Sequence, residues 1–143
     1  MAKKIIFLGI FAVCLCGITS AGINSGRIRP IDRPGSIYTW GLDTWGQVSN
    51  KPSGSDFIAV SGGEYHSIAL RANGKIEVWG RDEYGQISQA PTEADFVNIA
   101  AGFGHNVAIR RDGSLVSWGM NESGQLGNGT RATSYQPLPV RNP

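Results

Sequence analysis

The chain has 143 residues, of which 20 are glycine and 17% are charged. Glycine stands at about twice its usual share and is costly inside helices, which excludes a helical bundle and favours short strands joined by tight turns. Seven prolines without a low-complexity run exclude collagen and simple disorder, and a net charge of +2 gives no basic surface for nucleic acid.

The N-terminal segment has the pattern of an export signal. Lys3 and Lys4 provide a positive start, an uncharged apolar run covers residues 5–18, and small residues follow at 19–21. The run is short for a membrane span, which needs about 20 apolar residues. We therefore predict a signal peptide at residues 1–21 and a secreted or periplasmic protein, with a retained N-terminal anchor as the alternative.

Removal of this segment would change the chemistry of the chain. Both cysteines, Cys14 and Cys16, would be lost, and with them any disulfide or cysteine-based zinc site. The loss of Lys3 and Lys4 would leave 11 basic residues against 11 acidic ones. The chain from residue 22, which begins with a linker at residues 22–34, is thus expected to be neutral, with no nucleic-acid partner and no membrane contact beyond the signal.

The rest of the sequence, residues 35–143, is an array of repeats with a period of 39 residues. Two dipeptides recur at this interval: Trp40-Gly41, Trp79-Gly80 and Trp118-Gly119; and Gly46-Gln47, Gly85-Gln86 and Gly124-Gln125. Single positions follow the same register: Phe57, Phe96 and Tyr135; Gly63 and Gly102; His66 and His105. Chance does not hold so many positions in register.

Each unit is expected to contain three strands and a further short one near Ile87. The apolar runs place these strands at residues 57–60, 66–70 and 75–79, and again at 96–99, 105–109 and 114–118. Asn73-Gly74 and Asp112-Gly113 predict type I′ hairpin turns between the second and third strands. Sheets of this size must stack face to face to bury their apolar residues, as the blades of a propeller do.

Two parts of the repeat resemble a known family. Residues 118–130, followed by Pro137, Pro139 and Val140, form one half of its motif, and residues 101–114 form the other. The chain is similar to the regulator of chromosome condensation repeat family, including short-repeat secreted bacterial members such as a propeller-type β-lactamase inhibitor. This resemblance implies an all-β, partial β-propeller fold in a family that is normally seven-bladed.

The array is shorter than that resemblance would require. Seven units of this period need about 270 residues, whereas the sequence provides about two complete blades and two half blades. The array starts in mid-unit at Gly35-Ser36 and ends in mid-unit near Val140. Three explanations remain open: a fragment of a longer protein, a degenerate short paralogue, or protomers that assemble as a homo-oligomer closing a ring.

The repeated polar and aromatic residues are interpreted as structural. His66 and His105 occupy one place in two units, which is typical of packing and hydrogen bonding rather than catalysis. No cysteine or carboxylate stands at ligand spacing beside them, so we expect no metal, no cofactor and no catalytic residue. The tryptophans of the Trp-Gly pairs are expected to be core residues between blades.

Positions that differ between the copies are the candidates for recognition. They lie in the loop after each Trp-Gly pair and between the glycine and histidine of each unit, and they are Trp45, Tyr84, Glu64, Tyr65, Phe103, Asp43, Asp82 and Glu83. Aromatic side chains on polar loops are typical anchors of protein interfaces. It remains open whether these side chains only cover neighbouring blades.

The hypothesis that follows is an exported, non-enzymatic repeat module that recognises a protein through blade-edge loops. A glycan-binding propeller is one alternative. A second alternative, implied by the family resemblance, is a regulator of a small GTPase that acts like a guanine nucleotide exchange factor. A hydrolase with a histidine base is the weakest hypothesis, because it depends on His66 and His105 alone.

Overall fold

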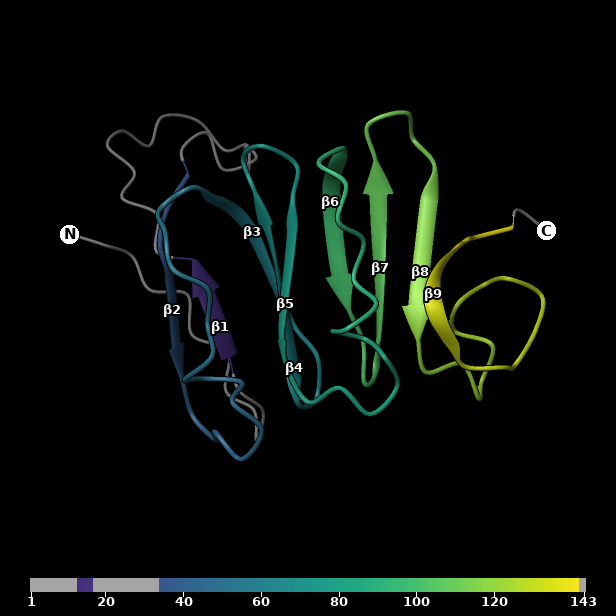
Figure 1. The fold of residues 1–143 in the computed structure, drawn as a ribbon, viewed down its shortest axis with the longest axis horizontal. Coiled ribbons are helices and arrows are strands. Elements are labelled where there is room, and N and C mark those ends of the chain that lie inside the picture. Colours follow the sequence, from purple (N-terminus) through teal and green to yellow (C-terminus); the bar gives the residue numbers. More distant parts are fainter. Residues whose placement is uncertain (1–12, 17–33, 142–143) are drawn as a thin grey trace, which may run out of the picture.

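The computed structural model describes residues 13–16 and 34–141, and every regular element in these ranges is a β-strand (Figure 1). The strands are β1 (Val13–Cys16), β2 (Ile37–Trp40), β3 (Phe57–Gly62), β4 (His66–Arg71), β5 (Ile76–Gly80), β6 (Phe96–Ala101), β7 (His105–Arg110), β8 (Leu115–Gly119) and β9 (Ser134–Pro139). The described ranges contain no helix that is long and apolar enough to cross a membrane.

The strands form three antiparallel sheets that stand side by side in Figure 1. The first sheet pairs β1 with β2, the second has the order β3-β4-β5, and the third has the order β6-β7-β8-β9. The three strands predicted for each complete unit are therefore confirmed, with ends that differ by one or two residues. The stacked sheets carry the all-β architecture expected from the repeat.

The repeat keeps the same pairing register in every sheet. Trp79 on β5 pairs with Ser67 on β4, and Trp118 on β8 pairs with Asn106 on β7. Trp40 on β2 pairs with Val13 on β1, so β1 takes the place that β4 and β7 take in the later sheets. The predicted signal peptide lies outside the described residues except for β1, and export remains a prediction.

The hairpins lie where the sequence predicts them, but their turns differ from the predicted type. The Gly74 N–H donates to the Arg71 carbonyl at 2.9 Å, and the Gly113 N–H donates to the Arg110 carbonyl at 3.0 Å. A two-residue Asn-Gly turn would close one residue later along the chain. Each loop thus has three residues, with a glycine of positive φ as its last member, and the type I′ prediction is wrong.

The fourth strand is also placed differently from the prediction. Ile87 lies in a turn, not a strand, so the second sheet has only three strands. In the third sheet the fourth strand is β9, which contains Tyr135 and pairs with β8. Phe57 and Phe96 instead begin the first strand of a new sheet and are buried, whereas Tyr135 is exposed. The shared 39-residue spacing of these three residues therefore does not give them one structural role.

Two apolar cores hold the sheets together. The first joint, between the first and second sheets, consists of Ile37, Phe57, Ala69 and Trp79. The second joint, between the second and third sheets, consists of Ile68, Leu70, Ile76, Phe96, Ala108, Val116 and Trp118. Each joint takes apolar residues from both of its sheets, so neither sheet buries its faces alone.

The Trp-Gly tryptophans are core residues in two of the three copies. Trp79 and Trp118 are buried, and each indole N–H reaches back to the preceding unit, to the carbonyl of Gln47 (2.9 Å) or of Gln86 (3.0 Å). Trp40 is 45% exposed, so the expectation of a core residue is wrong there. It lies on the face of the first sheet that points away from the other two, where the described residues provide no preceding sheet.

Candidate functional site

The candidate recognition residues all lie at one end of the array. Because β3 runs antiparallel to β4, and β4 to β5, the turns at 63–65 and 102–104 share an end with the loops that follow each Trp-Gly pair. We call this end the loop face. The three-residue hairpins at 72–74 and 111–113 lie at the opposite end. The two sets of candidates, which are separate in the sequence, therefore lie on one surface.

Each loop after a Trp-Gly pair is held by the glutamine of its Gly-Gln turn. The Gln47 Oε1 accepts the Trp45 N–H at 2.7 Å, and the Gln86 Oε1 accepts the Tyr84 N–H at 2.7 Å. The third copy repeats the bond, from the Ser123 N–H to the Gln125 Oε1 at 2.8 Å. The variable residue before each glycine thus extends from a fixed turn.

The carboxylates of Asp43 and Asp82 close the same loops. Asp43 Oδ1 accepts the N–H groups of Val48 and Ser49 at 2.8 and 3.0 Å, and these bonds lower the pKa of Asp43. Asp82 makes the equivalent pair of bonds, to the N–H groups of Ile87 and Ser88. In the third copy Asn121 takes this role. The two aspartates, which the sequence placed among the binding candidates, therefore shape the loops.

Three of the candidates gather around Arg81, a residue that the sequence analysis did not single out. The guanidinium carbon of Arg81 lies 4.8 Å from the ring centroid of Trp45 and 5.6 Å from that of Tyr65. Glu83 forms an ion pair with the same guanidinium. Trp45 nevertheless remains 46% exposed. The cation stacks on both rings and fixes their positions across the junction of two sheets.

The other candidates lie around the next junction. Tyr84 is half-buried because its ring lies over Gly104, where an added Cβ would come within 2.7 Å of the tyrosine Cδ2. Glu64 is also half-buried, and its N–H donates to the carbonyl of Phe103 at 3.3 Å. Phe103 itself is 57% exposed. Of the candidates, Trp45 and Phe103 are thus the aromatic residues whose side chains are largely exposed on the loop face. Tyr135, which is 58% exposed, also lies at this end, against Gly85.

One of the two histidines, His66, connects neighbouring units. His66 is buried, and its Nε2 lies 3.0 Å from the Oδ1 of Asn106, whose Nδ2 donates to the Gln86 carbonyl at 2.9 Å. His105 is half-buried, and its ring lies directly against Gly102. The described residues contain no group of three or more histidine, cysteine, aspartate or glutamate side chains that could hold a metal ion. The environment of His66 fits the interpretation of packing and hydrogen bonding.

Acid is expected to destabilise the fold through these histidines. Burial lowers the pKa of His66 and of His105 below 6.5, so the unfolded chain binds protons that the folded chain does not. Their contribution to stability is complete above about pH 6.5 and is lost as the pH falls below it. The free energy of unfolding should decrease by up to about 1.4 kcal/mol per pH unit for His66, and by less for the half-buried His105.

Urea unfolding at a series of pH values measures this dependence. His66→Gln should flatten the decrease that begins below pH 6.5, because glutamine does not titrate. The acidic groups whose pKa is lowered, Asp43 and Asp112, lose their contribution only at still lower pH. A chain whose stability stays constant across this window would contradict the assignment.

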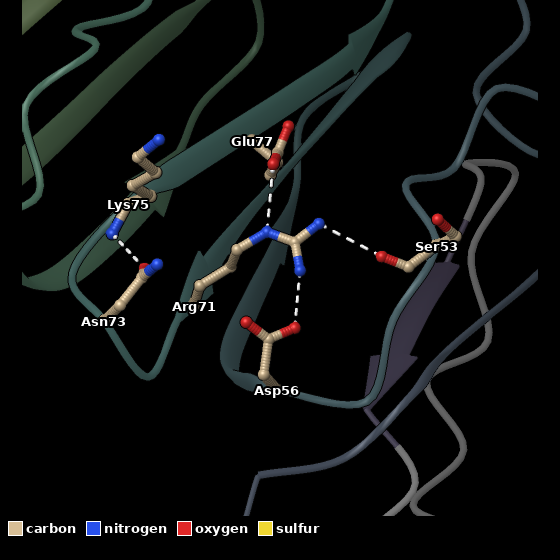
Figure 2. Close-up of polar contacts among 6 residues, drawn as sticks. All are labelled: Ser53, Asp56, Arg71, Asn73, Lys75 and Glu77. Atoms are coloured by element: carbon tan, nitrogen blue, oxygen red, sulfur yellow. Dashed lines mark hydrogen bonds and ion pairs between the residues drawn. The ribbon is translucent and has the colours of Figure 1, made fainter.

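The opposite end of the array is closed by ion pairs (Figure 2). Arg71 bonds to Asp56 (2.5 Å), Glu77 (2.9 Å) and the Ser53 carbonyl (3.0 Å), and its guanidinium covers the Phe57 ring. The next unit repeats the arrangement with Arg110, Asp95 and Phe96. Because these charged side chains already bond to one another, they stabilise the pairing of the strands at this end.

Comparison with protein families finds the same repeat in three places. Residues 57–86 and 96–125 each match one form of the regulator of chromosome condensation (RCC1) repeat, and residues 112–143 match a second form. Together the matches cover more than half of the chain. A comparison with curated proteins found no match to this sequence.

Several solved structures have the same fold. Prp20p from Saccharomyces cerevisiae matches with a TM-score of 0.63 and 22% identity over 75% of this chain and 34% of its own. Human WBSCR16 matches with a TM-score of 0.66 and 19% identity, over 91% of this chain and 38% of its own. The ectodomain of the Physcomitrella patens receptor kinase CR4 matches with a TM-score of 0.56 and 23% identity, over 78% of this chain and 27% of its own. The chain spans about a third of the length of these structures and forms a partial β-propeller.

Proposed function

The chain belongs to the RCC1 repeat family, and from that premise we propose that it is a non-catalytic module that recognises a protein partner through its loop face. The observation that carries the proposal is the loop architecture. The same glutamine bond and the same Asp or Asn bonds hold each loop, while the residue before the glycine changes from Trp45 to Tyr84 to Ser123. A constant frame with variable side chains is suited to specific binding.

The exposed aromatic residues are the anchors in this proposal. Truncation of a buried aromatic or arginine anchor at an interface commonly costs 2 kcal/mol or more of binding free energy. Trp45 is already held against Arg81, and Phe103 extends from a turn whose carbonyl is bonded to Glu64. Side chains held in place before binding lose less conformational entropy when a partner covers them.

The proposed setting is outside the cytoplasm, with export directed by the N-terminal segment. The basic start and the apolar run of residues 3–18 support this setting. One of the structures that share the fold is the ectodomain of a receptor kinase. Immunoblotting of cell, envelope and medium fractions for the full chain, with and without residues 3–18, tests the proposal; a chain found in the cytoplasm alone would refute it.

The binding proposal is tested with a double variant, Trp45→Ala with Phe103→Ala. Partners captured by the immobilised full chain are identified by mass spectrometry, and their affinities are then measured by biolayer interferometry. The double variant should bind at least 10-fold more weakly, because both exposed anchors are removed. Its stability should change little, since neither side chain belongs to a core cluster.

The control removes surface from the opposite end of the array. Lys75→Ala with Arg111→Ala changes two exposed hairpin side chains and should leave the affinity unchanged. Equal binding by the wild-type chain and the Trp45/Phe103 variant would refute the role of the loop face. Equal losses in both double variants would indicate a nonspecific interaction.

Regulation of a small GTPase is the second candidate. It is favoured by the fold likeness to Prp20p, a protein described with its binding properties to Gsp1p and histones. A nucleotide exchange assay with a panel of small GTPases separates the two functions. Accelerated nucleotide release by the full chain would support this candidate, and its absence across the panel would leave the recognition module as the proposal.

A further inference from the structure

The two joints between the sheets are built from the same parts. In each joint a tryptophan of the later sheet donates its indole N–H to a glutamine carbonyl of the earlier unit: Trp79 to Gln47, and Trp118 to Gln86. In each joint the earlier sheet contributes an isoleucine at the start of its last hairpin strand. Ile37 enters the first core, and Ile76 enters the second. Every joint therefore has a tryptophan half and an isoleucine half.

The two outer faces of the array each expose one of these halves. On the first sheet, Trp40 is 45% exposed, and Tyr38, two residues before it on the same side of β2, is also exposed. On the third sheet, Leu115 takes the place of Ile37 and Ile76 and is 40% exposed. Val97, on β6 of the same sheet, is 46% exposed, whereas its equivalent in the second sheet, Ile58, packs against the second core.

We propose that a second copy of this chain covers each outer face, so that the chain associates head to tail through a joint of the same kind as the two internal ones. Trp40 of one copy would pack on Leu115 and Val97 of the next. The Gly124-Gln125 turn provides the carbonyl that corresponds to those of Gln47 and Gln86. The proposal is independent of the loop face and of its partner.

The occupant is specified by the chemistry of the exposed halves. The exposed residues named for the two halves, Trp40 and Tyr38 on one and Leu115 and Val97 on the other, are all uncharged. Each half is the complement of the other rather than of itself. A self-complementary surface would pair two tryptophan faces, but the internal joints pair a tryptophan face with an isoleucine face. A head-to-tail contact of this kind generates a closed ring if its rotation closes and an open chain if it does not.

The test uses two variants of the full chain, Trp40→Glu and Leu115→Glu. Each variant places a charge in one half of the joint and keeps the other half intact. Alone, each should be monomeric in sedimentation velocity at concentrations where the wild-type chain associates, with self-association weakened about 30-fold or more. Mixed in equal amounts, the two variants should form a dimer, because each supplies the face that the other lacks.

The mixed sample distinguishes the proposed geometry from the alternatives. If Leu115→Glu alone still associates while Trp40→Glu does not, two tryptophan faces pair with each other and the head-to-tail geometry is refuted. A wild-type chain that is monomeric at every concentration refutes the proposal outright. Circular dichroism of each variant confirms that the exposed substitutions leave the strands intact.

Trp45→Ala is the matched control. Trp45 has nearly the same exposed fraction as Trp40 but lies on the loop face. Its removal should leave the wild-type mass distribution unchanged. A decrease in mass equal to that of Trp40→Glu would show that association depends on the loop face, and would overturn the proposed joint.

Discussion

Trp118→Ala is expected to lower the free energy of unfolding by about 3–5 kcal/mol and to leave much of the chain unfolded at 25 °C. Trp118 is fully buried in the second joint, next to Phe96 and Leu70. Its removal leaves a cavity and also takes a hydrogen bond from the Gln86 carbonyl. Because each sheet depends on its neighbours for stability, the loss should spread through the array.

Two further variants separate the causes of this effect. Trp118→Phe keeps most of the ring but removes the indole N–H, and should cost about 1 kcal/mol for the hydrogen bond plus the smaller loss of volume. Trp40→Ala changes the same residue type at an exposed position and should cost less than about 1 kcal/mol. Urea unfolding followed by far-ultraviolet circular dichroism, in dilute samples, measures all three. Equal losses at positions 40 and 118 would contradict the joint.

Gly102→Ala is the second substitution with a large expected effect, a destabilisation of roughly 1–3 kcal/mol from overpacking. A Cβ on Gly102 would lie 2.0 Å from Cε1 of His105, and its nearest neighbours are all atoms of that one ring. The clash should therefore disappear when the ring is removed. In the double variant Gly102→Ala with His105→Ala, the glycine substitution should cost far less than it does alone.

Gly63→Ala provides the comparison. There a Cβ would approach the His66 ring at 2.3 Å, and also the backbone carbonyl of Gly102 at 2.5 Å. Removing the ring with His66→Ala leaves the carbonyl in place, so the rescue should be incomplete. A double-mutant cycle from urea unfolding gives both coupling energies. Coupling that is absent at both sites would refute the contact between ring and glycine.

The 39-residue spacing was sufficient to predict the three strands of each complete unit, because each of these strands is set by an apolar run and ended by a glycine turn. The spacing could not show that Tyr135 leaves the pattern. Phe57 and Phe96 each enter a core, whereas β9 adds Tyr135 to the edge of the sheet that precedes it. The choice between starting a new sheet and extending an old one depends on pairing across space, which a single sequence does not display.

The candidate site was predicted only in outline. Variation between copies pointed to residues that the structure brings together at one end of the array, where Trp45 and Phe103 are exposed. It did not separate exposed residues from loop-forming ones such as Asp43, whose carboxylate is bonded to the backbone. Arg81 was missed because an arginine in a polar loop is unremarkable until its two aromatic neighbours are seen in space.

Asn106 shows a further limit. It occupies the position of Ser67, and the two residues look interchangeable as polar members of an apolar strand. Only in the structure does the longer side chain of Asn106 bridge His66 and the Gln86 carbonyl, while the Ser67 hydroxyl is buried without a hydrogen-bond partner among the described residues. The second joint is thus better bonded than the first, although their sequence patterns are alike.

The hydrogen bond at each joint also bears on how such an array can grow. Its acceptor is a main-chain carbonyl, which every residue possesses, and only its donor, the tryptophan indole, requires a particular side chain. The accepting loop can therefore diverge in sequence without losing the bond. A tandem duplication of residues 57–95 would add a unit that carries both the donating tryptophan and the accepting carbonyl. In one step, the new unit could therefore form the joint hydrogen bond with the unit before it and with the unit after it.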